Sequence, residues 1–237
     1  MPSYYCPDLN ANSKQIVLDK DEHHHLCRVK RIGVDDVITL NNGRGILADC
    51  KILKIDKSMA VLEPINIEYH NKSKITYAIA FALLKNRNDE LVVEKCTELG
   101  ASDFFPFISE NTVKEEGKNT IERFKKIVLS AMKQCNNPWM PQVHNLARVQ
   151  DLVNLIVEHG YEPVVCSEHE QENWLNMVDC TQNICFIIGP EGGFSNLELG
   201  LMKGIDNITI GSLVTRAETA AIAIASQYLL YKELSTK

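Results

Sequence analysis

The residues best suited to a binding site lie in two glycine-containing turns in the last third of the chain. The first turn, residues 189–193 (GPEGG), follows the apolar run at residues 184–188, and the second, at Gly211, follows residues 207–210. Both apolar runs are short and rich in β-branched residues, which predicts buried strands. Glycines at strand ends let a backbone approach a ligand closely, so we expect a ligand crevice beyond the carboxyl ends of two parallel strands. For the first turn taken alone, a tight turn without function is the alternative.

Two charged residues, Arg216 and Glu218, stand where the last helix is expected to begin. Thr215 and Glu218 have the Ser/Thr-x-x-Glu spacing of a capping box, as Ser195 and Glu198 have after the first turn. For Glu218, a capping role and a catalytic role both stay open. A guanidinium at a helix N-terminus opposes the macrodipole, so Arg216 is expected to have a partner such as a phosphate or a carboxylate.

Composition and motifs exclude or disfavour several classes of protein. The turns do not read G-x-G-x-x-G, and no Gly-Lys-Ser/Thr follows, which excludes the standard dinucleotide and nucleoside triphosphate sites. The net charge of −6 argues against general polyanion binding, so any nucleic-acid surface must be a local patch. The eight cysteines contain no C-x-x-C pair and are expected to be free thiols. No run is long enough to span a membrane and no secretion signal is present, so we expect a cytoplasmic protein without a membrane partner.

Residues 1–69 are expected to form a small β-barrel. Short alternating runs separated by turn-forming residues are typical of barrel strands. They occur at residues 15–18, 37–40, 46–55 and 59–62. One helix is expected to interrupt them at about residues 21–30.

This helix carries a histidine run and a basic run. The three consecutive histidines at residues 23–25 point about 100° apart on a helix and do not easily converge on one ion. We therefore expect one histidine to pack inward and no metal site. The basic run consists of Arg28, Lys30 and Arg31. It is either an RNA contact or a solvated charged face, and both interpretations stay open.

Residues 70–237 are expected to form an α/β domain. Strands and helices alternate here, which predicts a largely parallel sheet with helices on both faces. Strands are expected at residues 75–82, 104–108, 163–166, 184–188 and 207–210. Helices are expected at residues 89–99, 121–135 and 152–159, after residue 195, and from 215 to about 232. Pro106 lacks an N–H group, which predicts an edge strand at 104–108.

Three segments of this domain resemble a known family. Residues 189–195 (GPEGGFS), followed by residues 216–226 (RAETAAIAIAS), strongly resemble the signature of the SPOUT-class 16S ribosomal RNA uracil-N3 methyltransferases. Residues 95–100 (KCTELG) are similar to the K-x-x-E-L-G helix of that family.

The resemblance extends over nearly the whole chain. Gln134, before Pro138 and Pro141, is similar to a proline-bearing loop of the family. The N-terminal module, with residues 25–31 (HLCRVKR), is similar to its PUA-like RNA-binding barrel. The motifs are most specific at the C-terminal end.

The resemblance implies an α/β trefoil knot, a homodimer, and S-adenosylmethionine bound in the knot without a metal. It also implies the substrate, which is one uridine of 16S rRNA in the small ribosomal subunit, methylated at N3. The cofactor pocket is expected to use the backbone at Cys166, Ile188, Gly189, Glu191, Gly193, Ile210, Gly211, Leu213, Val214 and Arg216.

Such a reaction sets three tasks for the protein. Uracil N3 lies in Watson–Crick pairing, so the base must be unpaired or flipped out. The site must then align N3 with the methyl carbon, remove the N3 proton and stabilise charge on the uracil oxygens. Arg216 is the candidate for positioning and charge stabilisation, and Glu191 or Glu218 is the candidate proton acceptor. Two alternatives stay open: another SPOUT enzyme that methylates tRNA or a ribose 2′-oxygen, and a non-catalytic RNA-binding protein with a degenerate knot.

Three arginines that are usual in the family are absent. Their positions are occupied by Asn111, Asn137 and Leu213. Fewer arginines predict weaker binding to RNA phosphates. The expected fold does not depend on these three side chains.

Overall fold

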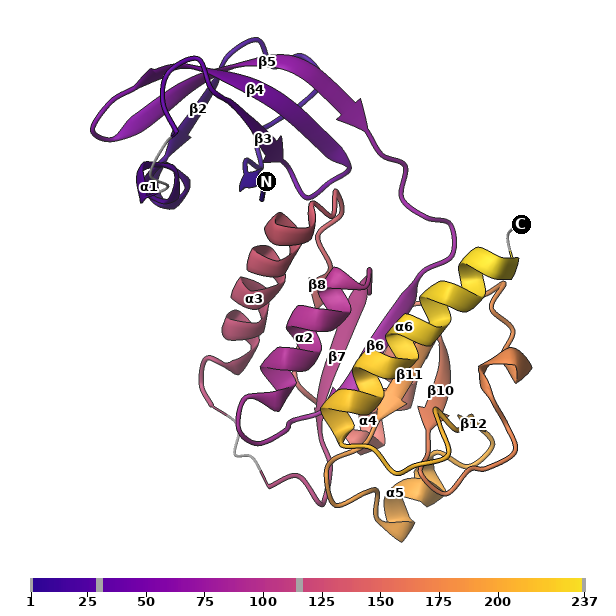
Figure 1. Ribbon diagram of the computed structural model, residues 1–237. Helices are drawn as coiled ribbons and strands as arrows, with labels where there is room; N and C mark the ends of the chain where they lie inside the picture. The colour runs from indigo at the N-terminus through magenta and orange to yellow at the C-terminus, as the bar shows by residue number, and fades with distance from the viewer. Residues whose placement is uncertain (1, 29–31, 114–116, 236–237) are drawn as a thin grey trace. The chain divides into compact units, whose positions relative to one another are not determined.

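The computed structural model describes residues 2–28, 32–113 and 117–235, and the chain divides into two compact units (Figure 1). One unit contains Met1–Lys72 and Leu129–Met140, and the other contains Ser73–Val128 and Pro141–Lys237. We expected a division after residue 69, and the N-terminal segment of the first unit ends at Lys72. No sequence pattern indicated that residues 129–140 belong with the N-terminal unit.

The N-terminal unit contains a curled sheet and one helix. Its elements are β1 (Tyr4–Tyr5), β2 (Ile16–Asp19), α1 (Lys20–Arg28), β3 (Val37–Asn41), β4 (Ile46–Ile55) and β5 (Met59–Tyr69). The five strands pair in the order β1-β3-β4-β5-β2. Inward-facing residues of the sheet pack with Leu26 of α1 in one core. The four expected strands are present, and β5 continues well beyond its expected end.

The helix α1 places its histidines as expected. His23 is buried, and its Nε2 lies 2.9 Å from the carbonyl oxygen of Asp56. His24 and His25 are exposed. The prediction that one histidine packs inward is therefore confirmed. Within the described part of the chain, no group of three or more His, Cys, Asp or Glu residues is arranged to hold a metal ion.

Residues 136–140 join the N-terminal unit through the turn at residues 41–45. The N–H of Gly45 donates to the Pro138 carbonyl (2.8 Å), and the N–H of Met140 donates to the Gly43 carbonyl (2.9 Å). Gly45 has φ +92°, and a Cβ there would lie only 2.5 Å from the Trp139 ring. These contacts join residues far apart in sequence, which explains why sequence patterns did not indicate them.

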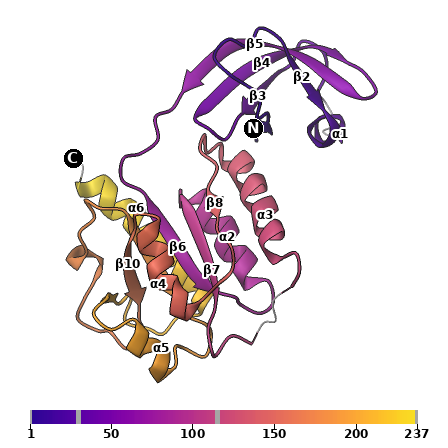
Figure 2. The same ribbon diagram turned by 180° about the vertical axis from the view of Figure 1, so that it is seen from behind.

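The second unit is built on a parallel sheet of seven strands. The strands are β6 (Tyr77–Ala82), β7 (Asp103–Ile108), β8 (Gln142–Val143), β9 (Ala147–Arg148), β10 (Glu162–Cys166), β11 (Ile184–Ile188) and β12 (Asp206–Ile208). Their order is β12-β10-β11-β6-β7-β8, and β9 also pairs with β7. The described residues that follow β6 form six helical elements: α2 (Asn88–Glu98), α3 (Thr120–Cys135), α4 (Val149–Glu158), the short 3₁₀ helix η1 (Leu175–Met177), α5 (Asn196–Leu201) and α6 (Ala217–Ser235). The part of α3 from Leu129 onward belongs to the first unit. Figure 2 shows α4 on the face of the sheet opposite to α2 and α6, as the strand–helix alternation predicted.

The path of the chain through the sheet is not sequential at its C-terminal end. From β11, which pairs with β10 on one side and β6 on the other, the chain continues through α5 to β12 at the far edge. It then returns in α6, which packs on β11 and α2. The turns that follow β10, β11 and β12 thereby share the carboxyl edge of the sheet.

The prediction that residues 104–108 form an edge strand is wrong. β7 pairs with β6 on one side and with the two short strands β8 and β9 on the other. β8 pairs with Asp103 and Phe104, and β9 pairs with Phe107 and Ile108. Pro106 lies between these two short ladders, so its missing N–H group interrupts neither of them.

A polar network is buried where β6 and β7 begin. Asp103 is 9% exposed, and its Oδ1 lies 2.8 Å from Nε2 of His144. The hydroxyl of Tyr161 donates to Oδ2 of Asp103 and lies 3.2 Å from the Thr76 hydroxyl. Burial, followed by the Asp103 hydrogen bond, raises the pKa of Tyr161. The phenol therefore remains a donor to the carboxylate.

We expect the change Tyr161→Phe to lower the free energy of unfolding by about 1.5–3 kcal/mol, because a buried carboxylate loses a donor. Tyr228 offers the matched control: it is 1% exposed, and its hydroxyl has no hydrogen-bond partner among the described residues. Tyr228→Phe should leave the free energy of unfolding unchanged or raise it. Chemical denaturation measures both variants, and equal losses would contradict the role given to the Tyr161 hydroxyl.

Candidate functional site

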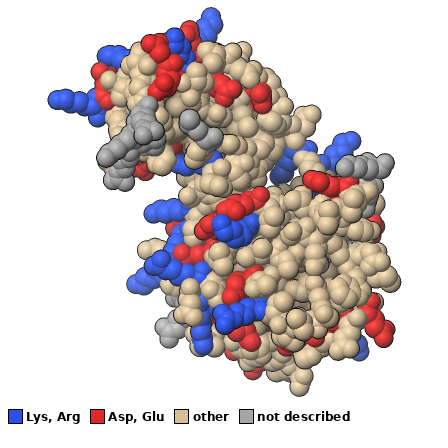
Figure 3. Space-filling view, viewed as in Figure 1, with Lys and Arg blue, Asp and Glu red and all other residues tan. Residues whose placement is uncertain are grey.

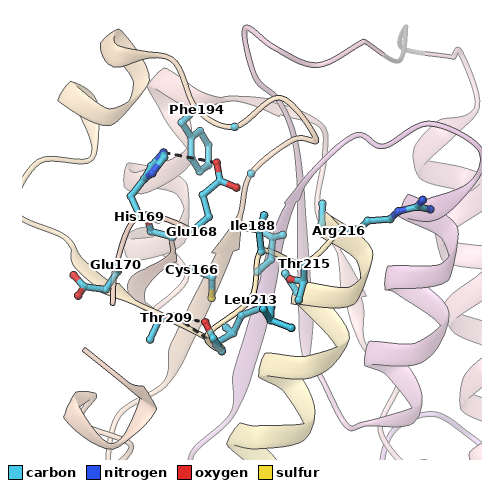
Figure 4. A pocket seen from close by; sticks show the side chains of 18 of the residues that line it. Cys166, Glu168, His169, Glu170, Ile188, Phe194, Thr209, Leu213, Thr215 and Arg216 are labelled. Atoms are coloured by element: carbon cyan, nitrogen blue, oxygen red, sulfur yellow. Dashed lines mark hydrogen bonds and ion pairs between the residues drawn. The ribbon is translucent and has the colours of Figure 1, made fainter. Parts of the chain in front are cut away.

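A cavity of about 680 Å³ opens at the carboxyl ends of β10, β11 and β12 (Figure 4). Three stretches of chain form most of its wall: residues 166–174 after β10, 188–194 after β11 and 209–217 after β12. A crevice at this edge of a parallel sheet is the usual place for a ligand.

All ten residues expected to form a cofactor pocket line this cavity. They are Cys166, Ile188, Gly189, Glu191, Gly193, Ile210, Gly211, Leu213, Val214 and Arg216. Leu213 and Val214 are 79% and 75% exposed, so their side chains lie largely in solvent. The structure therefore brings the two glycine-containing turns together, as the doubled strand–turn–helix pattern predicted.

The first turn depends on glycine at two positions, for different reasons. At Gly189, a Cβ would lie 2.9 Å from the ring of Phe194, so no side chain fits without displacing that ring. At Gly193 the backbone has φ +70°, a conformation that residues with a side chain adopt only with strain. The N–H of Gly193 donates to the Pro190 carbonyl (2.9 Å) and closes the turn.

Of the two capping boxes expected, the first is present. The N–H of Glu198 donates to Oγ of Ser195 (3.3 Å), and the N–H of Ser195 donates to Oε2 of Glu198 (2.9 Å). These two bonds begin helix α5.

The prediction of a second capping box, between Thr215 and Glu218, is wrong. Helix α6 begins at Ala217, and the carbonyl of Arg216 accepts from the N–H of Ala220 (2.9 Å). Arg216 therefore takes the N-cap position, and Glu218 is the second helical residue, one place early for a capping box. Glu218 is buried, and its Oε2 has no hydrogen-bond partner among the described residues.

The three candidate catalytic residues differ in their relation to the cavity. Arg216 lines it and is exposed, and Figure 4 shows its guanidinium pointing away from Glu168 and Glu170. Glu191 also lines it, and its Oε1 accepts from the N–H of Lys85 (3.1 Å), just beyond β6. Glu218 does not line the cavity.

Sequence reasoning missed residues 167–174, a strand-end segment that forms one wall of the cavity. It contributes Glu168, His169, Glu170 and Trp174 to the lining. Oε1 of Glu170 accepts from three successive backbone N–H groups, residues 171–173, and these bonds lower the pKa of Glu170. The same strand-end rule that indicated the glycine turns would have found this segment, because it directly follows the expected strand at residues 163–166.

Cys166 lines the cavity as a neutral thiol. Burial raises the pKa of this thiol well above its usual range. A thiolate nucleophile is therefore disfavoured at this position, and Cys166 contributes a small apolar surface.

The expected RNA contacts in the N-terminal unit stay a prediction. Lys30 and Arg31 lie outside the described residues, and Arg28 is described only as the last backbone position of α1. No described helix is long and apolar enough to cross a membrane.

Two family models match the chain. An RNA methyltransferase domain matches residues 71–229, and an RNA methyltransferase PUA domain matches residues 18–65. Together with the parallel sheet and its cavity, these matches define an RNA methyltransferase with an N-terminal PUA domain.

Similar proteins narrow the class further. The ribosomal RNA small subunit methyltransferase E of Aquifex aeolicus is 30% identical over 239 residues, which cover 95% of this chain and 98% of that protein. Its counterpart in Rickettsia conorii is 31% identical over 231 residues, covering 93% and 91%. The solved structure of the Neisseria gonorrhoeae enzyme bound to S-adenosyl methionine has the same fold, with a TM-score of 0.87 at 22% identity over 98% of both chains. This chain belongs to the ribosomal RNA small subunit methyltransferase E family, which confirms the family that its motifs resembled.

Proposed function

We propose that this protein transfers a methyl group from S-adenosylmethionine to N3 of one uridine of 16S rRNA in the small ribosomal subunit. The observation that carries the proposal is the convergence of all ten expected cofactor residues on one cavity, in a chain of this family. The N3 position and the 16S substrate come from the signature in residues 189–195 and 216–226.

The residues of the cavity fit S-adenosylmethionine. Its volume, about 680 Å³, lies within the range of small-molecule sites. Ile188, Phe194 and Leu213 supply apolar surface for an adenine ring, and the glycines of the first turn leave backbone groups within reach of a ligand. The carboxylates of Glu168 and Glu191 suit the positive charges of the sulfonium and amino groups.

When bound, the cofactor supplies an electrophilic methyl group next to the target base. Arg216 then positions the uracil and stabilises negative charge on its oxygens, since this exposed guanidinium has no ion-pair partner among the described residues. Of the two carboxylates, Glu191 is better placed to take the N3 proton because it lines the cavity and Glu218 does not.

The RNA partner and the assembly state complete the proposal. The PUA-like unit is the expected RNA-binding part, through Arg28, Lys30 and Arg31.

We also propose a homodimer through α6, where Leu230 and Leu234 are 60% and 64% exposed. Figure 3 shows few charged side chains over this helix, and the cores of protein–protein interfaces are depleted in charged residues. We further propose a cytoplasmic location, because the proposed substrate is ribosomal.

The choice of RNA is tested by transfer of label from S-adenosylmethionine carrying a tritiated methyl group. Purified protein is incubated with small ribosomal subunits, free 16S rRNA and tRNA that lack the modification. We expect label in 16S rRNA, as the free molecule or in the subunit. Label in tRNA alone would show that the substrate is tRNA and not 16S rRNA. Failure to bind S-adenosylmethionine would favour the alternative of a non-catalytic RNA-binding protein.

A further inference from the structure

A loop that does not line the cavity holds the first glycine turn from outside. This loop, residues 109–112, follows β7, whereas the glycine turn follows β11, and β6 lies between these two strands in the sheet. Their carboxyl ends share one edge, so the loop after β7 reaches the turn across the end of β6.

Asn111 makes the contact. Its Nδ2 donates to the carbonyl of Gly193 (2.9 Å) and approaches the carbonyl of Gly192 (3.4 Å). A Cβ on Gly192 would lie 3.3 Å from Cβ of Asn111, so the two backbones approach closely. One side-chain amide thus fixes the direction of two successive carbonyl groups in the turn.

Glu198 fixes the loop that carries Asn111. Glu198 is 6% exposed. Its Oε2 accepts from the hydroxyl of Ser109 (3.0 Å), and its Oε1 accepts from the N–H of Glu110 (2.8 Å). The loop is closed by a bond from the N–H of Ser109 to Oγ1 of Thr112 (2.9 Å). The carboxylate that caps α5 therefore also anchors the neighbouring loop, and Asn111 is presented on a supported turn.

The geometry points to Asn111 as a positioning residue for the cofactor cavity, an inference that rests on the proposed function of that cavity. Asn111 acts through the turn, because Gly193 and Phe194 line the cavity and Asn111 does not. In a trans peptide the C=O and the following N–H point in opposite directions. The bond from Asn111 to the Gly193 carbonyl therefore directs the N–H of Phe194 away from Asn111.

The variant Asn111→Asp tests this role at constant size. It replaces the amide donor with an anionic acceptor that faces two carbonyl oxygens. We expect the Kd for S-adenosylmethionine, measured by calorimetry, to rise at least ~10-fold, with KM for the cofactor rising and kcat at saturating cofactor staying within about twofold. Amide hydrogen exchange at Gly193 and Phe194 should quicken in the ligand-free protein. Asn111→Ala removes the donor without adding a charge that repels the carbonyl oxygens. It should raise the Kd and the exchange rate by less than Asn111→Asp does.

Asn196→Asp is the matched control. Asn196 is the exposed first residue of α5 and does not line the cavity. The variant therefore adds the same charge to the same region, but it does not change the hydrogen bonds from Asn111 to the glycine turn. It should leave affinity and exchange unchanged. Parental affinity and exchange in folded Asn111→Asp, or an equal loss in Asn196→Asp, would overturn the inference. If the parent protein itself binds no S-adenosylmethionine, the proposed function fails, while the exchange of ligand-free protein still decides the role of Asn111.

Discussion

Gly193→Val is expected to abolish S-adenosylmethionine binding in a protein that still folds. A valine at φ +70° carries strain of about 1–2 kcal/mol, which the turn relieves by changing its backbone. If the turn keeps its backbone, the new side chain enters the space beside Glu168, whose Oε1 lies 3.5 Å from the position of the added Cβ. Either outcome removes the surface that we propose the cofactor contacts, so we expect affinity to fall at least ~100-fold by calorimetry.

Gly160→Val separates this effect from general strain. Gly160 also has positive φ, +80°, but nothing lies within 4 Å of its added Cβ, and it does not line the cavity. This variant should lose a similar amount of stability and keep its affinity for the cofactor. Unchanged affinity in folded Gly193→Val would show that the first glycine turn does not contact the cofactor.

Arg216→Ala is expected to lower the single-turnover methylation rate by about 10²–10³-fold, the effect of removing one group that stabilises charge in a transition state. Arg216 occupies the N-cap position of α6, where a cation opposes the helix dipole. Stability should therefore stay near the parent value or rise slightly. Arg216→Lys keeps the charge without the planar fork and should recover only part of the rate.

Glu218→Gln is the paired variant. Glu218 is buried with Oε2 unpartnered among the described residues, and glutamine keeps its volume without a buried charge. We expect most of the activity to remain and the free energy of unfolding not to fall. The reverse pattern, an active Arg216→Ala protein and a stable Glu218→Gln protein whose rate collapses and no longer rises with pH, would make Glu218 the proton acceptor.

Several local sequence patterns correctly predicted the structure around them. Short β-branched runs that end in glycine identified β11 and the turns of the cavity. Such a pattern can be read from the sequence because the need for glycine at a strand end arises from steric crowding within the turn itself. The Ser195–Glu198 spacing predicted the start of α5 for the same reason. The inward turn of one histidine followed from helix geometry alone.

Two predictions were wrong, and one contact near the cavity was not predicted at all. Pro106 suggested an edge strand, but two separate short strands accommodate it. Thr215 and Glu218 have capping-box spacing, yet α6 begins one residue later than that box requires. The hydrogen bond from Asn111 to the Gly193 carbonyl joins residues 82 positions apart, and a single sequence has no pattern that pairs them.

Mass spectrometry of nucleosides tests the central claim most directly. Small subunits that lack the modification are incubated with the protein and S-adenosylmethionine, and their 16S rRNA is then digested to nucleosides. The account predicts one new species, N3-methyluridine, that depends on Arg216. A 2′-O-methylated nucleoside, a methylated base other than uracil, or no new species in the presence of bound cofactor would contradict it.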